Sequence, residues 1–185
     1  MSDAVDGLRW RCHSKIEKYH GRVHDRLDEV EPYEVWEREG NLLMAGGADL
    51  MWIGMKTGLS ATTGLKNTIF GGTAKGTAIG VGASSAAAAI TQNNLQASST
   101  KLRKKVDAGY PTHTTGLTGS TNQKMVFKTT FTTTQANWAW KEWGIFNSTA
   151  NSTANSRMLN RVADNTMGTK TSSATWAITV TLSLA

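Results

Sequence analysis

Apolar and polar residues alternate strictly near the end of the chain. From Trp176 to Leu184 every second residue is apolar, and alanine, threonine and serine fill the positions between them. The same period of two recurs from Met125 to Phe131. Since successive side chains of a β-strand point to opposite faces, these two segments predict half-buried antiparallel strands whose threonines face water.

Shorter segments of similar character precede these strands. Residues 77–81 and 101–106 predict strands bounded by Gly, Asp and Pro. The segments 147–156 and 165–173 are polar and rich in small residues, as hairpin loops are. Several short strands joined by such loops predict a mainly β chain, folded as an antiparallel β-sandwich or a jelly roll.

Apolar residues in the N-terminal segment recur at spacings of three and four instead of two. That spacing predicts an amphipathic helix over residues 14–30, with Ser14 and Glu17 as a capping box and Pro32 as its stop. A lone helix of this length is marginal in water, so its apolar side must pack against the body or against another chain. We therefore predict an assembly interface that consists of Ile16, Tyr19, Val23, Leu27, Val30 and Trp36.

Charge divides the chain near Gly40. Residues 1–40 hold seven basic and ten acidic side chains, whereas the other 145 residues hold thirteen basic and four acidic ones. We therefore expect a charged helical arm at 1–40 and a β-sandwich body at 41–185, with one apolar, buried helix at 41–56. The basic excess favours solubility or an acidic partner surface. Nucleic-acid binding is not expected, because the basic residues are scattered and no nucleic-acid motif is present.

Residues that could support catalysis or hold a metal lack the necessary spacing. The glycines from Gly71 to Gly82 are not followed by the Lys-Ser/Thr pair of a phosphate loop. His20 and His24 stand four apart without a third ligand. A hydrolase would need a cleft that joins His113 to a carboxylate. With one cysteine, no apolar run of membrane-spanning length and no signal peptide, we expect a soluble, non-enzymatic chain without cofactor or metal.

Clustered tryptophans allow two interpretations. Trp138 and Trp140 share one face of a predicted strand and suit a core between two sheets, while Trp143 points to the other face. A carbohydrate-binding β-sandwich module is the alternative function, and it requires Trp138, Trp143 or Trp176 at the surface, where each could stack on a sugar ring. Glu142 lies in an acid-poor region, so we expect it to pair with a nearby base or backbone donor.

Several ordered blocks of the body resemble virion proteins of tailed bacteriophages. The C-terminal blocks contain the sequences ANWAWKEWGIFN, RMLNR, MGTKTSS and TWAITVTL, and the upstream blocks contain AIGVGASS, NLQ and KLRKKVDAGYP. The resemblance covers roughly residues 41–185. The repeated Asn-Ser-Thr-Ala of the loop 147–156 departs from the glycine-containing turn usual in that group, and residues 1–40 match nothing in it.

The resemblance implies a non-enzymatic structural component of a virion, similar to head-decoration, neck or tail-associated proteins. Such a component would be made in the cytoplasm of the bacterial host and would assemble as a symmetric oligomer, a trimer or a ring, on capsid, neck or tail subunits. Attachment through the arm at 1–40 is our own expectation. Many weak, identical contacts would together provide avidity. We expect no membrane partner, and a host glycan is the partner that the alternative function implies.

Overall fold

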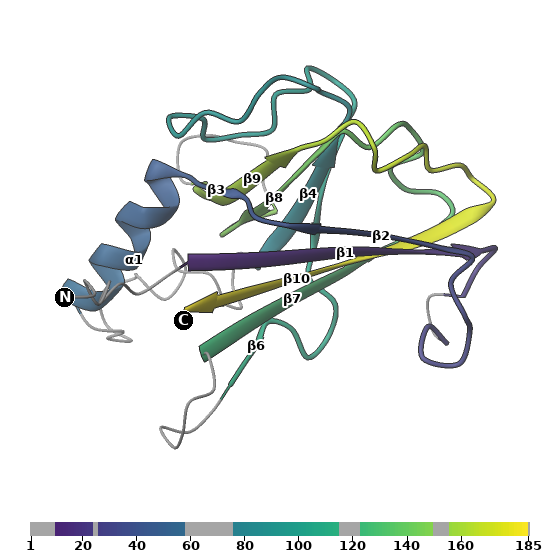
Figure 1. Ribbon diagram of the computed structural model, residues 1–185, viewed down its shortest axis with the longest axis horizontal. Helices are drawn as coiled ribbons and strands as arrows, with labels where there is room; N and C mark the ends of the chain where they lie inside the picture. The colour runs from purple at the N-terminus through teal and green to yellow at the C-terminus, as the bar shows by residue number, and fades with distance from the viewer. Residues whose placement is uncertain (1–9, 24–25, 58–75, 115–122, 150–155, 185) are drawn as a thin grey trace, which may run out of the picture.

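The computed structural model describes residues 10–23, 26–57, 76–114, 123–149 and 156–184, which form two five-stranded antiparallel sheets and one helix (Figure 1). Sheet A runs, in spatial order, through β2 (Glu34–Glu39), β1 (Trp10–His20), β10 (Ala174–Leu184), β7 (Gln123–Phe131) and β6 (Thr112–His113). Sheet B runs through β3 (Leu42–Leu43), β9 (Met158–Ala163), β8 (Glu142–Phe146), β4 (Ala78–Gly82) and β5 (Lys101–Lys105). The helix, α1, spans Ala45–Thr57.

The inner faces of the two sheets share one apolar core, as in a β-sandwich. Ile16 and Ile178 of sheet A belong to the same buried cluster as Val81 and Ile145 of sheet B. At one end of this core the Trp140 ring stands edge-on to its aromatic neighbours, with ring centroids 5.0 Å from Phe131 and 4.9 Å from Trp176. The mainly β, two-sheet prediction is confirmed, whereas a jelly-roll topology remains a prediction.

The strands with clear alternation are where the sequence predicts them. β7 and β10 pair along nine residues, from Trp176 opposite Phe131 to Leu184 opposite Gln123. β4 and β5 are also confirmed, each within one residue of the predicted bounds. No strand forms around Trp138 and Trp140, where Ala139 makes only an isolated bridge to Thr169. The strand β9 follows the 147–156 loop and was not predicted.

The helix predicted at residues 14–30 is wrong, because residues 10–20 form β1. This strand lies between β2 and β10, and it pairs with β10 over all eleven of its residues. Buried positions alternate along it as Cys12, Ser14, Ile16 and Lys18. Two of these four are polar, so the period of two is hidden from a hydrophobicity pattern. Residues 10–39 are therefore part of the sandwich and not a separate helical arm.

The second predicted helix is present as α1, but it is not buried all round. Its residue Leu50 is buried, and a Cβ on Gly47 would lie 2.5 Å from the Leu159 Cα atom, so the helix packs directly on β9. Trp52 on the same helix is 67% exposed, against the expectation of a core position. Gly58, which we expect to close the helix predicted at 41–56, lies outside the described residues. No helix in the described part of the chain is long and apolar enough to cross a membrane.

Candidate functional site

The segment 83–100 connects β4 to β5 and covers the outer face of sheet B (Figure 1). The Ala83 N–H donates to the Thr100 carbonyl at 3.0 Å and closes the base of this covering segment. Leu95 from its middle is buried in an apolar cluster with residues of β4, β8 and β9. Sheet B is consequently buried on both faces, which sets the environment of the polar residues that it carries.

Glu142, at the start of β8, is fully buried beneath the covering segment. Its Oε1 accepts the Ala97 N–H at 2.7 Å, and its Oε2 accepts the Gln96 N–H at 2.9 Å. The Arg161 guanidinium of β9, also fully buried, donates to Oε2 from Nε at 2.9 Å, and its Nη2 lies 2.8 Å from the same oxygen in an ion pair. The predicted pairing of Glu142 with a base or a backbone donor is confirmed, since it has both. Burial of the carboxylate is offset by these charge-assisted bonds.

Arg161 extends the network from the strands into the covering segment. Its Nη1 donates to Gln92 Oε1 at 2.9 Å, and its Nη2 donates to the Ala86 carbonyl at 2.8 Å. The ion pair therefore touches the covering segment at four residues, two through Glu142 and two through Arg161. A salt bridge placed in this way fixes the path of a segment that has no regular secondary structure of its own.

Glycines in β4 and β8 make room for these side chains. A Cβ on Gly82 would lie 2.5 Å from the Glu142 Oε1 atom, and one on Gly80 would lie 2.8 Å from the Phe146 ring. In β8, a Cβ on Gly144 would meet the Asn160 carbonyl oxygen at 2.8 Å. Gly80 and Gly82, two of the glycines considered for a phosphate loop, thus allow close packing at sheet B, while Gly71 and Gly72 lie outside the described residues.

Arg103 of β5 forms a second buried anchor for the covering segment. Its guanidinium lies 3.7 Å from the centre of the Phe146 ring, a cation–π geometry. Nη2 donates to Asn94 Oδ1 at 2.7 Å, and Nη1 donates to Ser156 Oγ at 2.6 Å. Desolvation lowers the pKa of Arg103 from 12.5 to about 10. The side chain stays charged at neutral pH and ties the β8–β9 loop to the covering segment.

Five of the seven blocks that were quoted for the phage resemblance contribute residues to this network. Glu142 comes from the first C-terminal block and Arg161 from the second, while Gly82, Gln96 and Arg103 come from the three upstream blocks. These positions are separated by up to about 80 residues in the sequence, yet they contact one another or a shared neighbour. The other two blocks, residues 167–173 and 175–182, lie in the loop before β10 and in β10 of sheet A.

Lysines hold the loop that follows β7. Lys170 is almost fully buried, and its Nζ donates to the Thr132 carbonyl at 2.7 Å and to Asn137 Oδ1 at 2.8 Å. Lys104 reaches the same region, where it donates to the Thr130 carbonyl at 2.5 Å and to Gln135 Oε1 at 2.8 Å. Desolvation, and then the charge of Lys104, lowers the pKa of Lys170 from 10.5 to about 8. Desolvation also lowers the pKa of Lys104, against the opposing effect of Asp107.

A third lysine joins β1 and β2 of sheet A to the core. Lys18 of β1 forms an ion pair with Glu34 of β2, and its Nζ lies 4.7 Å from the centre of the Trp176 ring. The three lysines share one arrangement, in which a cation from a strand or loop is surrounded by fixed acceptors. Each of these groups is engaged in holding chain segments together, which is the chemistry that the geometry supports.

The histidines do not form a common site in the described residues. His113 is exposed on β6 and lines an apolar cavity of about 310 Å³ together with Trp10, Met51, Met125 and Leu182. No described residue that lines this cavity carries a carboxylate, so the cleft that a hydrolase would need is not seen there. His20 stacks on Tyr33, and His24, which stands four residues further on, lies outside the described residues. Among the described residues, no group of three or more potential ligands could hold a metal ion.

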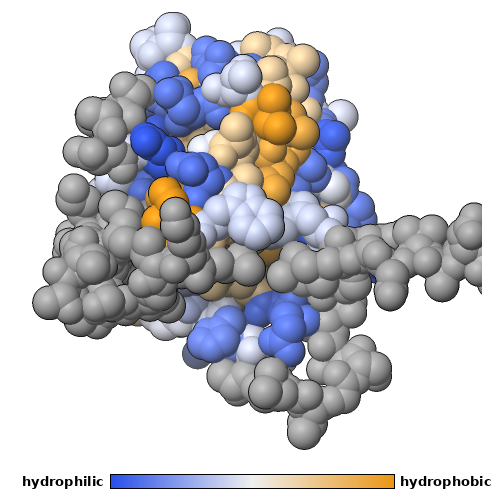
Figure 2. Space-filling view, turned by 90° about the vertical axis from the view of Figure 1, so that its left-hand side faces the viewer, coloured by the Kyte–Doolittle hydropathy of each residue, from blue (hydrophilic) through white to orange (hydrophobic). Residues whose placement is uncertain are grey.

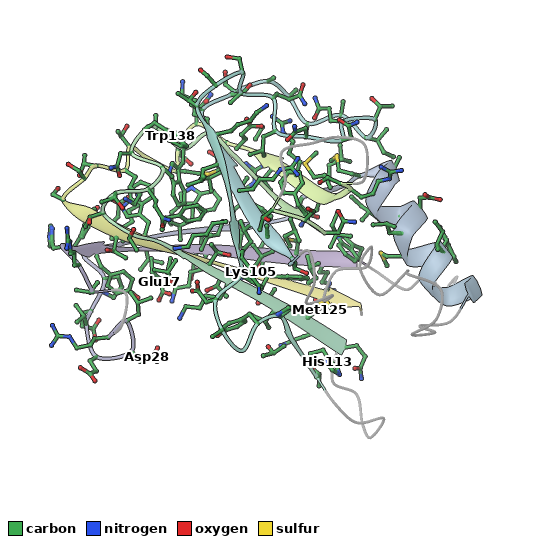
Figure 3. The ribbon with its side chains drawn as sticks, turned by 180° about the vertical axis from the view of Figure 1, so that it is seen from behind. Glu17, Asp28, Lys105, His113, Met125 and Trp138 are labelled. Atoms are coloured by element: carbon green, nitrogen blue, oxygen red, sulfur yellow. The ribbon has the colours of Figure 1, made fainter. Side chains whose placement is uncertain are left out.

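The tryptophans proposed for sugar binding are mostly internal. Trp143 and Trp176 are buried, and the predicted core position of Trp140 is confirmed. Trp138 packs against the core but is only half-buried, at the end of the molecule opposite His113 (Figure 3). Only Trp138 of the three candidates therefore offers any ring surface to a ligand.

The predicted assembly interface does not form one surface. Three of its residues, Ile16, Tyr19 and Trp36, are buried within this chain. The other three, Val23, Leu27 and Val30, are half-buried in the connection from β1 to β2. Instead, exposed apolar side chains occur at the end that carries α1 (Figure 2), where Ile90 is 55% exposed and its carbonyl accepts the Ala45 N–H at 3.0 Å.

Sequence reasoning missed the residues that build the buried networks. Arg161, Lys170 and Arg103 looked like ordinary solvated charges, because a single basic residue carries no pattern. One signal was available, since Glu142 is one of only four acids after residue 40. An isolated acid among glycines and tryptophans points to a buried partner of opposite charge.

Comparisons with known proteins do not identify the chain. No family model, no curated protein and no solved structure matches it.

Proposed function

We propose that this chain is a non-enzymatic structural subunit of a tailed-bacteriophage virion, located on the head, neck or tail. It would be made in the host cytoplasm and would assemble as a symmetric trimer or ring on other virion proteins. The observation that carries the proposal is the convergence of five of the seven resembling blocks on the network around Glu142 and Arg161. Residues of those blocks hold the covering segment in one conformation. A surface of fixed shape is what a subunit needs in order to fit its neighbours in a particle.

Exposed apolar residues near α1 supply a candidate surface for contact with the particle. Trp52 and Ile90 are 67% and 55% exposed, and large apolar side chains of this kind mark interaction sites when they gather on one face. This surface replaces the helical arm in the proposal, because residues 10–39 are built into the sandwich. Repetition of the contact by symmetry would allow each one to be weak.

Mass spectrometry of purified particles tests the proposal directly. Particles banded from a culture that produces the chain should contain it at a fixed ratio to the major capsid protein. Trp52→Asp should reduce incorporation, whereas the control Thr181→Asp, on the open outer face of sheet A, should not. If the chain is absent from the particles, the proposed function is wrong.

The carbohydrate-binding alternative rests on Trp138. Its ring is the one candidate with partial exposure among the tryptophans named for this role. A glycan array probed with the wild-type chain should give a signal that Trp138→Ala removes and that Trp140→Phe, a core control, retains. An array without signal would exclude this alternative for the glycans tested.

A further inference from the structure

An apolar cavity of about 310 Å³ lies at the end of the sandwich that carries α1 (Figure 1). Trp10 of β1, Leu182 of β10 and Met125 of β7 line it from sheet A. Met51 of α1 and Leu159 of β9 line it from the other side. The cavity is therefore a space between sheet A and the layer that β9 and α1 form.

The strand register brings one row of side chains to the wall that sheet A supplies. Leu182 stands opposite Met125 in the β10–β7 ladder, and Met125 stands opposite His113 in the β7–β6 ladder. Residues directly opposite each other in antiparallel strands point to the same face of the sheet. Leu182 belongs to the buried core, so the row faces the interior of the sandwich. His113 ends the row at the exposed edge of sheet A, next to Met125 on the neighbouring strand (Figure 3).

The wall of the cavity suits a flexible hydrocarbon chain. Five of the ten described residues that line it are large and apolar, and two of these five are methionines, whose unbranched side chains adapt to the shape of a ligand. A water molecule takes up about 30 Å³ of the liquid, and a methylene group is of similar size, so 310 Å³ accommodates a chain of about ten carbon atoms.

The charged part of the lining is basic. His113 and Lys124 both line the cavity and are exposed, so they mark its opening to solvent. None of the described lining residues is acidic. Because an apolar wall with a basic opening complements a molecule that has an apolar chain and a negative head group, the lining favours a fatty acid over a neutral or cationic ligand.

We infer that this cavity binds a fatty acid of about ten carbon atoms, with its chain between Met51 and Met125 and its carboxylate at His113 and Lys124. Burial of the methylene groups supplies the affinity, and the basic residues at the opening fix the direction in which the ligand enters. The inference does not depend on the proposed function, since it rests on the lining of the cavity alone.

Isothermal titration calorimetry of the full chain with sodium decanoate tests the inference. The wild type should show saturable binding of one decanoate per chain. Decylamine has a chain of the same length and the opposite charge, so it should bind at least about tenfold more weakly. The absence of saturable binding, or equal affinity for decanoate and decylamine, would overturn the inference.

A larger side chain in the cavity should compete with the ligand. Met125→Trp should weaken decanoate binding by about tenfold or more, because it fills the space that the chain occupies. The matched control is Val126→Trp, at the next position and on the other face of β7, outside the cavity lining, and it should bind like the wild type. Circular dichroism should show that both variants are folded. Equal affinities of the two variants would overturn the inference.

Methyl NMR of the wild type locates the ligand even if Met125→Trp does not fold. With ¹³C-labelled methionine, decanoate should shift the methyl signals of Met51 and Met125, which line the cavity. The signal of Met167 should not move, because Met167 is buried beside Gly168, whose carbonyl accepts the Trp140 N–H at the other end of the core. Unchanged signals of Met51 and Met125 at saturation would contradict binding in this cavity.

Charge reversal at the opening tests the position of the carboxylate. Lys124→Glu should weaken decanoate binding by about tenfold or more and leave binding of decan-1-ol, which carries no charge, within about twofold of the wild type. Lys128→Glu makes the same change on the same face of β7 but outside the cavity lining, so it should bind decanoate like the wild type. Equal decanoate affinities of the two variants would overturn the placement of the carboxylate.

Discussion

The outer faces of the two sheets differ in what covers them. The outer face of sheet A is open along the second half of β10, where Thr179, Thr181 and Ser183 are half-buried, whereas Thr175 and Ala177 nearer its start are buried. The outer face of sheet B is covered by the segment 83–100, and all five residues of β4 and of β8 are buried. One sheet of this sandwich therefore has water on one side, while the other has protein on both.

This difference explains which strands a hydrophobicity pattern can detect. A strand with one wet face alternates between apolar and polar residues, as β7 and β10 do. A strand buried on both faces has no such alternation. In sheet B it carries glycine where side chains crowd, as at Gly82, and a fully paired charge where a loop must be held, as at Arg161.

Removal of Arg161 should have the largest effect on stability. Arg161→Met leaves the Glu142 carboxylate buried with only its two backbone donors, and an uncompensated buried charge costs about 3–5 kcal/mol. Urea unfolding followed by circular dichroism should show that loss, or a chain that does not fold. The double variant Glu142→Gln/Arg161→Met should be more stable than the single one. A loss below about 1 kcal/mol in the single variant would contradict a structural role for the pair.

Gly82→Ala in the covered sheet B should destabilise the protein more than a comparable substitution on the open face of sheet A. The new methyl group would lie 2.5 Å from Glu142 Oε1, so we expect a loss of about 1–3 kcal/mol in the free energy of unfolding. Thr181→Ala on the open face of β10 is the matched control in sheet A, with an expected change within about 0.5 kcal/mol. Equal losses in the two variants would show that coverage of sheet B does not crowd β4.

The lowered pKa of the buried Lys170 should make the free energy of unfolding depend on pH. The pKa of Lys170 is about 8 in the folded protein and 10.5 in the unfolded chain. Between pH 8 and 10.5 the unfolded chain therefore binds more protons at this residue than the folded protein does. Stability from this group therefore rises with pH across that window, by at most about 1.4 kcal/mol per pH unit.

The variant Lys170→Met isolates this effect from the other groups. Burial, and then the charge of Glu39, raises the pKa of the Cys12 thiol to about 12. The contribution of Cys12 to stability therefore falls as the pH rises above 9, opposite to that of Lys170. Urea unfolding should be measured for both proteins at pH 7.5 and at pH 9. The free energy of unfolding of the wild type, relative to that of the variant, should be higher at pH 9 than at pH 7.5. A difference that is independent of pH would mean that Lys170 titrates normally.

The smallest change is expected where sheet A faces water. Thr181→Lys adds a long charged side chain at a half-exposed position of β10, opposite Val126 of β7 in the ladder. Substitutions at such positions usually change stability by no more than about 0.5 kcal/mol. Thermal unfolding should therefore resemble that of the wild type, and a loss above about 1 kcal/mol would indicate that this face is covered.

The N-terminal segment shows why local patterns were insufficient. Spacings of three and four among Ile16, Tyr19 and Val23 fit a helix, but β1 buries Ser14 and Lys18, two polar residues that the pattern excludes. Lys18 can be buried because Glu34 and the Trp176 ring surround it. Those partners come from β2 and β10, the second of which is more than 150 residues away in the sequence.

The amino-acid sequence by itself determined that this chain is mainly β, because the alternation in β7 and β10 reflects a local property, the pleat of a strand with one wet face. It also indicated one helix at residues 41–56 and a base or backbone donor as the partner of Glu142. Only the tertiary structure decided that residues 10–39 complete sheet A and that Arg103, Arg161 and Lys170 are internal. A charged side chain can be buried only when segments that are distant in the sequence surround it with hydrogen-bond acceptors. A local sequence pattern does not contain information about those segments.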